Sequence, residues 1–223
     1  MTARSLTRAA FLAGLLSVSA IAFAPAAHAA RDASAEQYVQ ENGAAALRTL
    51  GDRSVSATQR RQTFNTLMAR FADMPRIAGY VLGRYGAQLR SDANLRNEWN
   101  RTFQEYAIAV YEDRLERFSG STIRVTNSIE RVAGRDVIVV SELTPRSGGR
   151  ATVVQWRLLR SGDAWKVIDV SLVLEGNNTI WLAQQQQRDF LAILDRNNGD
   201  IRALMTNLRT STAEMRTRIM ARS

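Results

Sequence analysis

The sequence contains no cysteine, and its single histidine, His28, lies close to the N-terminus of the 223-residue chain. Thiolate nucleophiles, Ser-His-Asp triads and the usual zinc sites all require these residue types. Carboxylate chemistry is therefore the only common catalytic route left open. Without cysteine no disulfide can form, so the fold has to be stabilised by a substantial apolar core.

Long hydrophobic runs are also scarce, and the only clear one is N-terminal. Arg4 and Arg8 precede an apolar run from Ala9 to Ala24, and Ala27-His28-Ala29 has the small-x-small pattern that a signal peptidase recognises. The run is too short and too rich in alanine for a membrane-spanning helix of about 20 residues. A retained N-terminal anchor remains the alternative. The pattern predicts a cleaved secretory signal peptide over residues 1–29.

Cleavage would leave residues 30–223, about 194 residues, which is enough for a single domain with a real core. No later segment approaches the length of a membrane span, so we expect the mature chain to be soluble. Its expected location is outside the cytoplasm, since the signal peptide directs export.

Acidic residues are outnumbered by basic ones, 21 to 30, and only Lys166 among the basic residues is a lysine. Loss of the signal peptide removes two arginines and lowers the net charge from +9 to about +7. An exported basic protein encounters anionic lipid headgroups and acidic protein surfaces more than nucleic acid. No interleaving of aromatic and basic residues marks a nucleic-acid face, so no nucleic-acid partner is expected.

Helical periodicity dominates the first half of the mature chain. It predicts helices over 34–50, 56–71, 73–86 and 91–119. Ser34, Ser56, Asp73 and Ser91 are the expected N-terminal caps, and Ser56 with Gln59 forms a capping-box pattern.

The period changes to two after residue 121. Strands are predicted over 122–130, 137–143, 151–159 and 165–174, and short turns join them into an antiparallel meander. The second and fourth strands are apolar on both faces, so cover on both faces is expected. Helices over 180–196 and 200–220 follow, and the whole pattern predicts an α+β fold.

Several segments, taken in order and spacing, resemble the MlaC or toluene-tolerance family of periplasmic phospholipid-binding proteins. These proteins are the soluble components of the lipid-asymmetry transport system between the two membranes of Gram-negative bacteria. The sharpest matches are Phe71-Ala72-Asp73-Met74-Pro75-Arg76-Ile77-Ala78, Val154-Gln155-Trp156-Arg157-Leu158, Trp165-Lys166-Val167-Ile168-Asp169-Val170 and Glu175-Gly176. The resemblance covers nearly all of the mature chain.

The chain departs from the family pattern at two places. Gly86 replaces the usual aromatic residue after the tyrosine, and the segment from Gly176 to Trp181 is longer and more polar than usual. In addition, the stretch from Leu182 to Phe190 resembles HpnM, the hopanoid-associated branch of the same superfamily. Hopanoid-type lipids are therefore the alternative cargo.

The resemblance implies a carrier without catalytic activity, cofactor or metal, built as a four-stranded meander packed by N-terminal and C-terminal helices around an apolar cavity. The implied partners are phospholipid, an inner-membrane ABC transporter with an MCE-domain ring, and an outer-membrane lipoprotein with its porin. Physical chemistry agrees, because an exposed acyl chain of about fifteen carbons costs roughly 12 kcal/mol in water. A cavity for two chains requires on the order of 1,000 Å³.

We expect the third strand to contribute one face to this cavity, although ordinary core packing would produce the same pattern. Four tyrosines, at positions 80, 85, 106 and 111, are candidates for the cavity mouth because they combine an apolar ring with a polar hydroxyl. The full set of expected lipid-binding residues is Val81, Tyr85, Tyr106, Val110, Val140, Val154, Trp156, Leu158, Val170 and Leu172.

Two competing functions remain open. The α+β pattern also fits the nuclear-transport-factor-like fold, in which an enzyme could act through a buried carboxylate such as Asp73 or Asp169. However, Asp73 is the expected helix cap, and Asp169 is expected to cap a loop or pair with an arginine. The other possibility is an adaptor whose apolar surface binds a protein.

Overall fold

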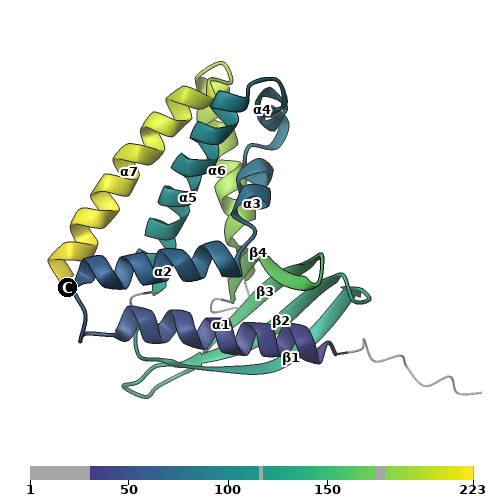
Figure 1. Ribbon diagram of the computed structural model, residues 1–223, viewed down its shortest axis with the longest axis vertical. Helices are drawn as coiled ribbons and strands as arrows, with labels where there is room; N and C mark the ends of the chain where they lie inside the picture. The colour runs from purple at the N-terminus through teal and green to yellow at the C-terminus, as the bar shows by residue number, and fades with distance from the viewer. Residues whose placement is uncertain (1–30, 116–117, 174–178, 223) are drawn as a thin grey trace, which may run out of the picture.

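The computed structural model describes residues 31–115, 118–173 and 179–222 (Figure 1). The expected signal peptide, residues 1–29, and the first three residues of the unusual segment from Gly176 to Trp181 lie outside these ranges. Within them, no helix is both long enough and apolar enough to cross a membrane.

Helices make up the first half of the chain. In order they are α1 (Ala33–Gly51), α2 (Ala57–Phe71), α3 (Met74–Val81), the 3₁₀ helix η1 (Gly83–Ala87), α4 (Gln88–Ser91) and α5 (Ala93–Leu115). The helix expected over 73–86 ends early, because Gly83 adopts a φ of +51° that ends the regular helix and leads into the 3₁₀ turn.

Two of the four expected caps are confirmed. The Ser56 and Gln59 side chains form the predicted capping box, and the Asp73 carboxylate accepts from the backbone N–H of Arg76 at 3.1 Å. The other two caps are aspartates rather than serines. Asp32 caps α1, and Asp92 accepts from the backbone N–H of Leu95 at 2.8 Å at the start of α5.

Among the described residues the sheet has five strands, one more than predicted. They are β1 (Thr122–Val132), β2 (Asp136–Thr144), β3 (Thr152–Ser161), β4 (Ala164–Val173) and β5 (Thr179–Trp181), and each pairs antiparallel with its neighbour in chain order. The helices α6 (Leu182–Arg196) and α7 (Ile201–Arg222) complete the α+β fold. The prediction missed β5 because three residues are too few to show strand alternation.

The helices lie mainly on one side of the sheet (Figure 1). α1 runs along the sheet, α2 lies beside α1, and α3, α5, α6 and α7 extend away from it. On the opposite face Ile138 and Val140 stay partly exposed, and Ile129 is 42% exposed. On this face the expected cover of β2 is therefore only partial, since Ile138 and Val140 are neither buried nor fully exposed.

A cluster of aromatic rings joins three of the helices. Trp99 stacks on Phe103 at 5.7 Å, Phe190 packs edge-on against Phe103 at 6.3 Å, and all three are almost fully buried. The Trp99 indole N–H donates to the Ala78 carbonyl at 2.9 Å. This cluster fixes α3, α5 and α6 relative to one another.

Candidate functional site

An apolar pocket lies between the inner face of the sheet and the surrounding helices. The empty space between its walls is about 700 Å³, a figure that includes space open to solvent. Only about 40 Å³ of this space can hold the centre of a water molecule. The side chains therefore nearly fill it. Its walls are formed by Ala46, Met68, Phe71, Ala72, Ile77, Tyr111, Arg114, Phe118, Leu143, Val154, Trp156, Val167, Val170, Leu172 and Leu182.

Four of the expected lipid-binding residues meet on the sheet wall of this pocket. Strand pairing places Val154 opposite Leu172, and Trp156 opposite Val170. The Trp156 indole N–H donates to the Ser141 hydroxyl at 2.8 Å, so its one polar group is satisfied. Two of the three residues on the expected apolar face of the third strand, Val154 and Trp156, thus lie in the pocket wall.

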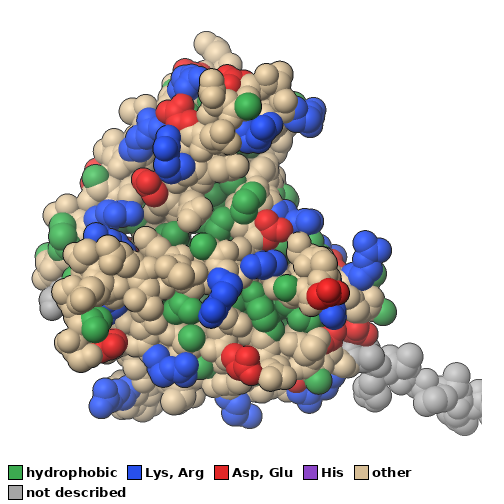
Figure 2. All heavy atoms as spheres, in the orientation of Figure 1, with side chains coloured by type: hydrophobic (Ala, Val, Ile, Leu, Met, Phe, Trp, Pro, Cys, Tyr) green, Lys and Arg blue, Asp and Glu red, His purple; other side chains and the backbone are tan. Residues whose placement is uncertain are grey.

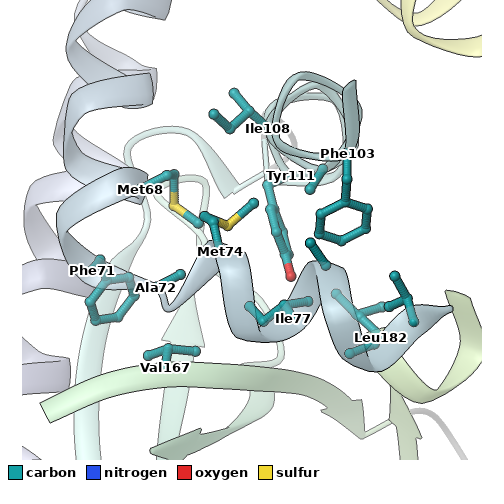
Figure 3. Packing of buried hydrophobic residues seen from close by; sticks show 14 of the residues in the cluster. Met68, Phe71, Ala72, Met74, Ile77, Phe103, Ile108, Tyr111, Val167 and Leu182 are labelled. Atoms are coloured by element: carbon teal, nitrogen blue, oxygen red, sulfur yellow. The ribbon is translucent and has the colours of Figure 1, made fainter. Parts of the chain in front are cut away.

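The junction between α2 and α3 supplies much of the helical wall. Ala72 bridges to Val167 of β4, and the Asp73 backbone N–H donates to the Val167 carbonyl at 2.9 Å. These contacts hold Met68, Phe71 and Ile77 against the sheet, as Figure 3 shows for this part of the core. The sequence interpretation did not name these residues as lining, although Phe71 and Ile77 lie in a segment that carries the family resemblance.

Three expected lipid-binding residues lie elsewhere in the protein interior. Val81 and Leu158 are fully buried in the main core and do not line the pocket, while Val110 belongs to a small separate cluster with Ala109 and Met215. Val140 lies on the opposite face of the sheet, where it pairs with Gln155.

The expected mouth tyrosines are dispersed. Tyr85 donates its hydroxyl hydrogen to Asp195 at 2.7 Å, Tyr106 packs on Phe190 at 5.8 Å, and Tyr80 is 46% exposed on α3. Only Tyr111 lines the pocket. Burial raises the pKa of the Tyr111 hydroxyl, so this group remains a neutral donor.

Asp169 bonds the start of a helix, whereas the sequence predicted that it caps a loop or pairs with an arginine. One of its carboxylate oxygens accepts from the backbone N–H groups of Val170 and Ala183, both at 2.8 Å, and so satisfies the N-terminus of α6. Burial raises its pKa, and hydrogen bonds from backbone N–H groups together with the charge of Arg157 oppose that rise. Neither Asp169 nor Asp73 lines the apolar pocket.

Basic and acidic side chains are mixed over the surface. Figure 2 shows arginine and lysine side chains spread over the visible face, with aspartate and glutamate among them. Several arginines of the described residues form ion pairs, including Arg124 with Glu142 at 2.6 Å and Arg209 with Glu98 at 2.8 Å. The visible face therefore carries no continuous basic stripe of the kind that tracks a nucleic-acid backbone.

Comparison with known proteins places the chain in a family. The family model described as MlaC protein matches residues 40–210, which include every residue of the pocket wall. The chain belongs to the MlaC family. No curated protein sequence matches it.

A solved structure shares the fold of this MlaC-family chain. It is the phospholipid-binding protein from Ralstonia solanacearum, determined in complex with a phospholipid at 1.53 Å. The two chains superpose with a TM-score of 0.68 and 20% sequence identity over 82% of this chain and 99% of the other. At this identity the match supports the shared fold.

Proposed function

We propose that the protein is a periplasmic carrier that binds phospholipid acyl chains in the pocket between sheet and helices. The observation that carries the proposal is a pocket wall of apolar side chains in a member of the MlaC family, whose fold matches that of a phospholipid-binding protein. Three of its lining residues carry polar side-chain groups: Trp156, Tyr111 and Arg114. The Trp156 N–H is bonded to Ser141, so only Tyr111 and Arg114 offer a polar group to a ligand. Such a surface binds alkyl chains better than polar substrates.

Binding requires the pocket to widen. Two acyl chains need a space on the order of 1,000 Å³, whereas the part of the pocket open to the centre of a water-sized molecule is only about 40 Å³. Met68 lines the pocket and Met74 lies beside it (Figure 3). Methionine side chains repack with little strain, so this helical wall is suited to moving away from the sheet. Burial of each methylene contributes about 0.8 kcal/mol towards that rearrangement.

The carrier would exchange its cargo at both membranes. MlaC-family membership supports an inner-membrane ABC transporter with an MCE-domain ring as one partner, and an outer-membrane lipoprotein with its porin as the other. The signal-peptide pattern supports the periplasmic location. Both aspartates considered for an enzyme act as helix caps, and no carboxylate lines the pocket among the described residues, which favours binding over catalysis.

Mass spectrometry of organic extracts tests this proposal. The protein would be purified without detergent from cells that make both phospholipids and hopanoids. We expect about one phospholipid for each protein molecule. Hopanoids in the same amount would contradict the phospholipid assignment while supporting a lipid carrier. Absence of either lipid in several preparations would contradict the carrier function.

A further inference from the structure

Two polar side chains, Tyr111 and Arg114, lie side by side in an otherwise apolar pocket. They are three residues apart on α5, so both project from the same side of this helix, about 4.5 Å apart along its axis. Tyr111 is buried and Arg114 is exposed, so the pair extends from the interior of the pocket to its rim.

The Tyr111 hydroxyl has no partner among the described residues. The side chain is only 7% exposed, and its hydroxyl points towards Ile77 and Leu182 on the opposite wall, neither of which offers a polar side-chain atom (Figure 3). The fully buried polar side-chain atoms without a partner among the described residues are Asn65 Oδ1, Ser171 Oγ and Arg216 Nε, so the Tyr111 hydroxyl keeps some contact with the pocket space. A ligand in the pocket can therefore offer this donor an acceptor.

Arg114 makes no hydrogen bond or ion pair with any residue that the structure describes. Some arginines are engaged, such as Arg157 with Asp136 at 2.8 Å and Arg202 with Glu98 at 2.6 Å, but among the arginines of the described residues Arg114 is the one that lines the apolar pocket. A guanidinium matches the geometry of a phosphate and binds it through two parallel hydrogen bonds. An unpaired arginine at the rim of an apolar pocket is thus suited to the phosphate of a lipid whose tails lie inside.

We propose that Tyr111 and Arg114 form a headgroup subsite, in which Arg114 binds the phosphate of a glycerophospholipid and Tyr111 donates a hydrogen bond to an ester carbonyl of the same lipid. This inference rests on the proposed function and deepens it, because it selects phosphate-bearing lipids over neutral ones. The competing explanation is that Arg114 interacts only with the C-terminal end of α5, whose last turn it occupies. That role would not depend on the lipid headgroup.

A comparison of two lipids with identical tails tests the Arg114 half of the subsite. Phosphatidylethanolamine and diacylglycerol would be supplied separately from cyclodextrin to lipid-stripped protein, and bound lipid counted. Phosphatidylethanolamine has no net charge, so long-range attraction contributes little. We expect about a 10-fold preference for it, lost in Arg114→Gln, with diacylglycerol binding unchanged. Arg218→Gln, an exposed position on α7 outside the pocket, is the charge-matched control and should keep the preference.

An unchanged preference in Arg114→Gln, or an equal loss in Arg218→Gln, would overturn the subsite while leaving the carrier function intact. If the unmodified protein binds neither lipid, the proposed function itself fails. Inorganic phosphate and glycerol 3-phosphate, added at millimolar concentration, distinguish a free-phosphate site. Displacement of the lipid by either compound would show that Arg114 serves a soluble phosphate, which would also overturn the headgroup assignment.

Tyr111→Phe tests the other half, because lipid binding should change while the stability of the lipid-free protein does not. Phosphatidylethanolamine binding should weaken about 5-fold, whereas the melting temperature of the lipid-free protein should stay nearly unchanged, since the hydroxyl makes no hydrogen bond with any described residue. Tyr106→Phe, on the same helix but outside the pocket, should leave lipid binding unchanged. Unchanged lipid binding in Tyr111→Phe would remove the tyrosine from the subsite.

Discussion

The indole of Trp156 has two roles in the pocket wall. Its ring packs against Phe71 at 5.7 Å, which joins the sheet to α2, and its N–H is bonded to the buried Ser141 hydroxyl. An aromatic side chain whose polar atom is satisfied presents a purely apolar surface to the pocket. Arg114, by contrast, keeps its charge free at the rim.

Val154, the neighbour of Trp156 on the same strand face, gives a prediction at the residue scale. In Val154→Trp the new indole would occupy space that an acyl chain takes when the pocket widens. Lipid bound per protein should fall by about half or more, while the lipid-free protein should lose at most about 1 kcal/mol of stability, the low end for overpacking. Extract mass spectrometry and thermal melting measure the two quantities.

Gln155→Trp is the matched control, because Gln155 projects from the opposite face of β3. It should change neither lipid content nor melting temperature appreciably. A stability loss above about 3 kcal/mol in Val154→Trp with unchanged lipid content would show that Val154 lies in close-packed core. Trp156 and Leu172 would then lose their assigned role as well.

Among the helices, α1 is attached to the sheet through a charged network. The Glu36 carboxylate accepts from the Arg31 guanidinium at 2.7 and 2.8 Å and from the Ser128 hydroxyl of β1 at 2.7 Å. These hydrogen bonds, that of Arg31 foremost, lower the pKa of Glu36 despite partial burial. The ionised carboxylate therefore contributes to the docking of α1 on the sheet.

This network predicts a pH dependence. A lowered pKa stabilises the fold above the ordinary glutamate pKa of about 4.3, and this contribution is lost as the pH falls through the folded-state value. In Glu36→Gln the free energy of unfolding should therefore be lower at pH 7 and should fall less below about pH 4.3. Urea unfolding across this range measures it. A curve parallel to that of the unmodified protein would contradict the account, and Glu41→Gln on the same helix is the control.

The elements also show what the sequence could and could not predict. Amphipathic helices and alternating strands appeared where expected, because burial on one face leaves a periodic pattern. β5 was missed because it has three residues, and the 3₁₀ turn after Val81 depends on the backbone of Gly83. The sheet wall of the pocket was predictable from strand alternation. The wall formed by Met68, Phe71 and Ile77 was not, because it depends on how the α2–α3 junction packs against β4.

At the scale of the whole molecule, the net charge of +9, about +7 after loss of the expected signal peptide, and the apolar pocket predict different responses to salt. Surface attraction to anionic membranes is screened, so lipid exchange with anionic vesicles should slow between low salt and about 0.5 M. Burial of the tails is not screened, so bound lipid should be retained at high salt. Stopped-flow exchange and lipid counting measure the two effects. Release of cargo by salt alone would contradict an enclosed site.

The sheet has a second apolar surface, on the opposite face around Ile129 and Ile138, which could bind lipid or protein in place of the pocket. Photo-crosslinking with a phospholipid that carries a diazirine on its acyl chain distinguishes the two surfaces most directly. Peptide mass spectrometry should place the crosslinks on pocket residues such as Phe71, Trp156 and Leu172. Crosslinks confined to Ile129, Ile138 and their neighbours on the opposite face would contradict the central claim that the tails lie between sheet and helices.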